Sequence, residues 1–110
     1  MSASARLFAL PDLGDLAPGE VRRIDDTPLG PVALVNVDGE LHATSDLCPH
    51  ARAPLSEGFV EGHWLVCPTH FAEFDVRSGE ARNAPPRCRP LVIHRLVRDG
   101  DRYCLEIPDK

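Results

Sequence analysis

The sequence predicts an all-β fold, and three observations carry this prediction. Short runs rich in valine, isoleucine and leucine recur along the chain, residues that favour turns separate them, and no amphipathic pattern is long enough for a ten-residue helix. A chain of 110 residues has room for one domain. We therefore expect a single β sandwich or barrel over residues 1–110.

Turn signals fix most of the expected strand ends. Asp38-Gly39 is the strongest hairpin signal, and Asp99-Gly100-Asp101 closes the last predicted hairpin. The prolines in Ala84-Pro85-Pro86 predict a loop, because proline has no backbone N–H to donate to a strand ladder. The predicted strands are 6–10, 21–24, 32–37, 40–45, 63–66, 73–76, 80–82, 91–97 and 103–107.

Composition excludes some classes of function. The 12 basic and 17 acidic residues give a formal net charge of −5, which argues against nucleic acid as a partner because phosphate binding needs a basic patch. No apolar run approaches the length of a membrane span. The N-terminal residues lack the apolar core of a signal peptide, so we expect a cytoplasmic protein without a membrane partner.

Two short segments, Cys48-Pro49-His50 and Cys67-Pro68-Thr69-His70, each supply one thiolate and one imidazole. Sixteen residues separate the first histidine from the second cysteine, so two loops can hold one metal centre between them. Thiolates suit zinc and iron–sulfur iron, while imidazoles suit zinc, iron and copper. A zinc site is one interpretation. The other is a [2Fe–2S] cluster in which two histidines replace two cysteines on one iron, and mixed ligands in both loops favour it.

At these residues the chain resembles the Rieske family. The resemblance extends to Leu55-Ser56-Glu57-Gly58 after the first pair, and to Phe74-Asp75 and Ser78-Gly79 after the second. It implies stacked antiparallel sheets with a small inserted cluster-binding subdomain, here from about 46 to about 82. It also implies one Rieske [2Fe–2S] cluster. The family pattern assigns one iron to Cys48 and Cys67 and the other iron to His50 and His70.

Several positions depart from other members of the family. Ala53 and Thr69 stand where high-potential members carry a disulfide, and Ala72 and Phe74 stand where they carry hydroxyls directed at the cluster. We therefore expect a potential at the low end of the Rieske range. Phe71 follows the second histidine in place of the usual glycine. Two interpretations stay open for it: an apolar contact beside His70, or packing into the base of the loop.

A free-standing chain of this kind resembles the ferredoxin component of multicomponent aromatic-ring-hydroxylating dioxygenases. The resemblance implies a one-electron carrier that is not catalytic alone. Its partners would be a flavin-containing NAD(P)H-dependent reductase and a terminal oxygenase with its own Rieske centre and mononuclear iron. We expect a monomer. The alternatives are a small Rieske-like subunit of another redox enzyme, such as assimilatory nitrite reductase, and a zinc-binding interaction module. Cys88 and Cys104 are interpreted as reduced and structural.

Overall fold

The fold is built almost entirely from β-strands. The computed structural model describes residues 6–49, 53–69, 71–84 and 88–108. Its named strands form three sheets, and all the paired neighbours run antiparallel. Within the described ranges the helical content is one short 3-10 helix, η2 (Leu55–Glu57), and no helix there is long and apolar enough to cross a membrane. The predicted all-β class is confirmed.

Each sheet has a simple order. The first sheet, in the order β1-β11-β10, contains β1 (Arg6–Ala9), β11 (Arg102–Ile107) and β10 (Leu96–Asp99). The second, in the order β2-β3-β4-β9, contains β2 (Val21–Ile24), β3 (Val32–Val37), β4 (Glu40–Ser45) and β9 (Ile93–His94). The third, in the order β5-β6-β7-β8, contains β5 (Phe59–Glu61), β6 (Trp64–Val66), β7 (Glu73–Asp75) and β8 (Ala81–Arg82).

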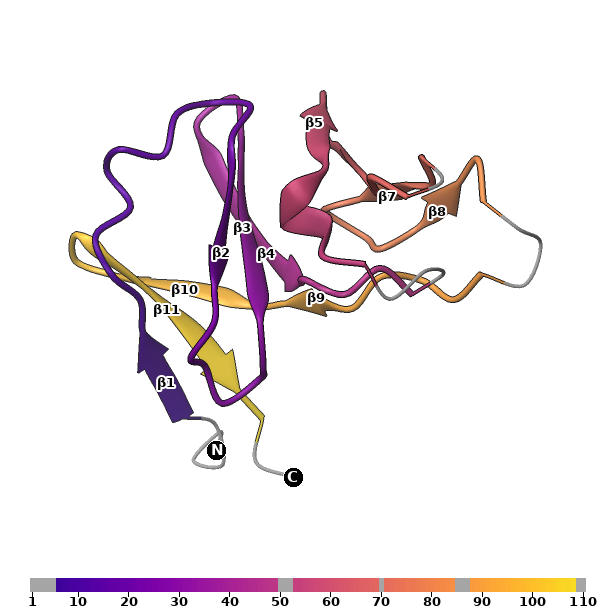
Figure 1. The fold of residues 1–110 in the computed structure, drawn as a ribbon. Coiled ribbons are helices and arrows are strands. Elements are labelled where there is room, and N and C mark those ends of the chain that lie inside the picture. Colours follow the sequence, from indigo (N-terminus) through magenta and orange to yellow (C-terminus); the bar gives the residue numbers. More distant parts are fainter. Residues whose placement is uncertain (1–5, 50–52, 70, 85–87, 109–110) are drawn as a thin grey trace.

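Strand β3 lies at the centre of the molecule and is buried on both faces. Val32 and Leu34 pack into a core that also contains residues of β11, whereas Ala33 and Val35 pack into a second core. Successive side chains of a strand point to opposite faces, so one strand can serve two cores. The sheet that contains β3 is therefore the middle layer, with β1, β10 and β11 on one side and the β5–β8 sheet on the other (Figure 1).

The β5–β8 sheet is inserted in the chain between β4 and β9, two neighbouring strands of the middle sheet. Cys48 precedes this sheet and Cys67 lies inside it, directly after β6. The insertion therefore places both cysteine segments on one side of the middle layer.

Two strand predictions differ from the structure. The predicted strand 91–97 is divided at Arg95: β9 pairs with β4, whereas β10 pairs with β11 in a different sheet. Strand β5, which pairs with β6 across the turn at Gly62, was not predicted. The other predicted strands are found with ends that agree within two residues.

Gly79 is the turn residue on which the packing of the β7–β8 hairpin depends. Its φ is +85°, and a Cβ at this position would lie 2.2 Å from the carbonyl oxygen of Leu91. We expect Gly79→Ala to lower the free energy of unfolding by about 2 kcal/mol, from the left-handed backbone and the steric overlap together. Urea denaturation measures this loss.

Gly100 provides the matched control, because its φ is +65° and a Cβ there would meet nothing within 4 Å. Gly100→Ala should cost about 1 kcal/mol from the backbone conformation alone. Equal losses in the two variants would contradict the proposed overlap with Leu91.

Candidate metal centre

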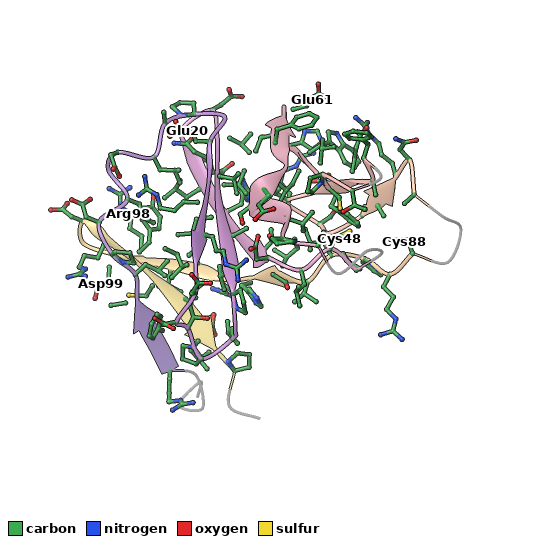
Figure 2. All side chains as sticks on the ribbon, in the orientation of Figure 1. Glu20, Cys48, Glu61, Cys88, Arg98 and Asp99 are labelled. Atoms are coloured by element: carbon green, nitrogen blue, oxygen red, sulfur yellow. The ribbon has the colours of Figure 1, made fainter. Side chains whose placement is uncertain are left out.

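Cys48 and Cys67 lie in the same buried core, with exposed fractions of 1% and 0%. Apolar side chains surround them; those fully buried in this core include Leu55, Leu65 and Phe74. Figure 2 shows Cys48 at the end of the molecule that holds the β5–β8 sheet, opposite the β10–β11 turn at Arg98 and Asp99. The fold thus brings together two thiols that are separated by eighteen intervening residues in the sequence.

The two cysteine loops are closed by the same type of hydrogen bond. The N–H of Cys48 donates to the carbonyl of Ala53 at 2.9 Å, and the N–H of Cys67 donates to the carbonyl of Ala72 at 2.8 Å. Each bond joins a cysteine to the alanine five residues later, and in both loops the cysteine is followed by proline. Each loop therefore holds its cysteine backbone in the same way, which suits two equivalent positions around one centre.

The buried carboxylate of Asp46 stabilises the first cysteine loop. Asp46 is 0% exposed, and its Oδ1 accepts the N–H of Ser56 at 2.7 Å. Its Oδ2 accepts the Ser56 hydroxyl at 2.9 Å and Nη1 of Arg23, on β2, at 3.0 Å. These contacts join the start of the loop to its end and to the middle sheet. Asp46 was not predicted as a functional residue, although it lies only two residues before Cys48, a predicted ligand.

The structure explains three residues of the motif Leu55-Ser56-Glu57-Gly58. Leu55 fills the core beside the cysteines, and Ser56 binds Asp46. Gly58 lies so close to β6 that a Cβ there would be 1.8 Å from the carbonyl oxygen of Val66. Because Val66 immediately precedes Cys67, this close approach packs the end of the first loop against the start of the second.

Phe71 adopts a left-handed backbone, with a φ of +62°, and its side chain is 56% exposed. Its N–H donates to the carbonyl of Cys67 at 3.0 Å. Of the two interpretations left open by the sequence, packing into the base of the loop is therefore wrong. The phenyl ring instead lies at the surface.

The two predicted histidine ligands, His50 and His70, lie outside the described residues. Within the described ranges, no group of three or more histidine, cysteine or acidic residues could hold a metal ion. The two cysteines still fit an iron–sulfur cluster, because a thiolate buried among apolar groups is costly unless a metal binds it. The sequence prediction of a four-residue ligand set thus stays a prediction.

Cys88 packs against the core that holds Cys48 and Cys67, whereas Cys104 lies on β11. Burial raises the pKa of the Cys88 thiol, and the electrostatic influence of Cys67 raises it further. Cys88 is a free thiol in the structure, and its structural role stays a prediction.

The sequence model described as the Rieske [2Fe-2S] domain matches residues 7–104. The chain belongs to the Rieske family. The ferredoxin component of biphenyl 2,3-dioxygenase from Rhodococcus jostii is 43% identical over 94 residues, which cover 86% of each chain. The predicted family, the Rieske-type [2Fe–2S] cofactor and the role of a carrier that is not itself catalytic are confirmed.

Solved structures of Rieske ferredoxins share the fold. The ferredoxin of Sphingomonas yanoikuyae B1 superimposes with a TM-score of 0.84 at 28% identity, over 94% of this chain and 100% of that chain. A second match is the complex of reduced oxygenase and oxidized ferredoxin in carbazole 1,9a-dioxygenase. It gives a TM-score of 0.79 at 28% identity, over 89% of this chain and 99% of the matched chain.

Proposed function

We propose that this ferredoxin takes one electron from a flavin-containing NAD(P)H-dependent reductase and passes it to a terminal ring-hydroxylating oxygenase. That oxygenase would carry its own Rieske centre and a mononuclear iron. The observation that carries the proposal is the pair of equivalent closed loops that bury Cys48 and Cys67 in one core. The names of the related chains support the partner class, since they belong to dioxygenase systems and one was solved with its oxygenase.

We further propose that residues from about 46 to about 82 act as the cluster-binding subdomain. Cys48 and Cys67 would hold the inner iron, and His50 and His70 the outer iron. The bound cluster supplies a site for one electron. The chain contributes two anionic ligands and two neutral ones, and the neutral imidazoles make the outer iron easier to reduce.

The surface near the first loop is suited to a brief encounter with a redox partner. A groove reaches the buried Cys48 between this loop and the segment before β9; its lining residues are Ser45, Leu47, Cys48, Pro49, Arg89, Pro90 and Val92. Leu47 and Val92 are exposed apolar residues, as is Phe71 near the second loop. Small interfaces suffice for weak redox encounters. We propose that these residues belong to the partner-facing surface.

The reduction potential of the chain should lie at the low end of the Rieske range, which is roughly −150 to +300 mV. Ala72 and Phe74 are buried beside the cysteines and carry no hydroxyl that could stabilise the reduced cluster. Phe74→Tyr should therefore raise the midpoint potential, by about 40 mV if the new hydrogen bond favours the reduced form by roughly 1 kcal/mol. Protein-film voltammetry measures the shift. Phe8→Tyr, in the other core, is the control and should leave the potential unchanged; equal potentials in all three proteins would contradict the role given to Phe74.

Rapid mixing with an oxygenase tests the proposed function. The dithionite-reduced protein, freed of excess dithionite, is mixed anaerobically with the oxidised oxygenase component of the Rhodococcus jostii biphenyl system. We expect the ferredoxin to be oxidised and the oxygenase Rieske centre to be reduced, one electron for one electron. A protein that stores an electron reversibly but passes none to the biphenyl or carbazole oxygenases would favour the alternative of a subunit in another redox enzyme.

We also propose that the chain is a monomer in the cytoplasm and has no nucleic-acid or membrane partner. A carrier must leave one partner before it meets the next, and a monomer exposes its cluster end to each in turn. NAD(P)H, the electron source of the proposed reductase, is a cytoplasmic reductant. Sedimentation of the loaded protein tests the oligomeric state.

A further inference from the structure

The second cysteine loop contains a conformation that needs support from outside the loop. Phe71 has a φ of +62°, and a bulky side chain in the left-handed region is a genuine outlier that costs roughly one to a few kcal/mol. Such conformations persist when surrounding contacts determine them. The Phe71 N–H is held by the Cys67 carbonyl within the loop. The Phe71 carbonyl, however, accepts a hydrogen bond from a residue outside the loop.

That residue is Asn83, whose Nδ2 donates to the Phe71 carbonyl oxygen at 3.2 Å. The register of β7 and β8 explains the contact: Glu73 pairs with Arg82, so Asn83 lies opposite the residues that precede β7. Asn83 itself has a φ of +55°. Asparagine tolerates this region better than most residues, which allows the side chain to turn back toward the loop.

Arg82 anchors the strand end from which Asn83 extends. Its Nε donates to Oε1 of Glu73 at 2.7 Å, and its guanidinium carbon lies 3.8 Å from the centre of the Trp64 ring. These two contacts tie β8 to both β7 and β6. Asn83 therefore follows a strand end that is held in place, so its side-chain amide can restrict the second cysteine loop.

We propose that Asn83 is a positioning residue for the second ligand loop. Its hydrogen bond fixes the peptide group between Phe71 and Ala72 and so restricts the backbone of Phe71. Because Phe71 directly follows position 70, this restriction limits the orientations open to the ligand proposed there. The inference rests on the proposed function, because it takes His70 to be a cluster ligand. Removing the amide should let the loop sample more than one arrangement while the sheets stay intact.

The test compares three variants of the cluster-loaded protein. Asn83→Gly removes the donor without adding strain at a positive φ, and Asn83→Asp keeps the shape but replaces the donor with an acceptor. Both should release iron to a chelator about three to ten times faster than the wild type, the range that one net hydrogen bond supplies. They should also broaden or split the electron paramagnetic resonance lines of the reduced cluster. Asp38→Gly, at a similar φ of +51° in the β3–β4 hairpin, is the control and should change neither property.

A double-mutant cycle then tests the coupling to Phe71. Glycine adopts a positive φ without strain, so in a Phe71→Gly background the loss of Asn83 should matter much less. Full additivity of the two changes would overturn the inference. So would wild-type iron release and spectra in Asn83→Gly and Asn83→Asp, or a fall in their urea midpoints that accounts for the faster release. A wild-type protein without a mixed cysteine–histidine spectrum would instead refute the proposed function itself.

Discussion

Replacing Cys67 with serine is expected to give a folded chain that contains less than roughly a tenth of the wild-type iron, because a serine hydroxyl does not supply a thiolate at neutral pH. Folding should survive, since the core between the middle sheet and the β1-β11-β10 sheet does not include Cys67. Iron and acid-labile sulfide per chain measure the loss, and far-ultraviolet circular dichroism reports the retained strands.

Cys104 offers a matched control because it is also a buried cysteine, but it lies on β11, outside the core that holds Cys48 and Cys67. Cys104→Ser places the same hydroxyl in a buried site and should leave the iron and sulfide contents at wild-type values. Equal iron contents in the two variants, whether both low or both full, would contradict the assignment of Cys67 as a ligand.

Asp46→Asn is expected to lower the free energy of unfolding by about 3 kcal/mol. The buried carboxylate accepts three hydrogen bonds, two from Ser56 and one from Arg23. An amide offers only one acceptor oxygen, so its NH2 group would face at least one of these donors. Urea denaturation measures the loss. Iron release should also become faster, because the two ends of the first loop are no longer joined.

Asp25 provides the control, since its Oδ1 accepts Nε of the same Arg23 at 2.6 Å but its side chain is 63% exposed. An exposed ion pair of this kind contributes little, so Asp25→Asn should cost at most about 0.5 kcal/mol. If Asp25→Asn were as destabilising as Asp46→Asn, the burial and the Ser56 contacts would not be what gives Asp46 its effect.

The features predictable from the sequence are those that depend on neighbouring residues. Asp38-Gly39 marks the β3–β4 hairpin correctly, because a tight turn is specified by the residues within it. The division at Arg95 depends instead on which sheet each half of the segment joins. No local pattern contains that information, so the segment 91–97 was predicted as one strand.

The same distinction applies to the site. The spacing of Cys48 and Cys67 and the residues after them predict the chemistry, because the proposed ligand loops are short and local. The supports of these loops come from distant positions: Arg23 lies on β2, and Asn83 follows β8. In the sequence alone, Arg23 and Asn83 are ordinary polar residues, and nothing near them indicates which residue they contact. Only the register of the sheets shows which loop each one reaches.

The electron paramagnetic resonance spectrum of the anaerobically purified, dithionite-reduced protein tests the central claim most directly. Mixed cysteine and histidine ligation predicts a rhombic signal whose average g lies below that of clusters with four cysteine ligands. A sample that gives no such signal and contains stoichiometric zinc but no acid-labile sulfide would contradict the claim. The chain would then be a zinc-binding interaction module with a Rieske fold.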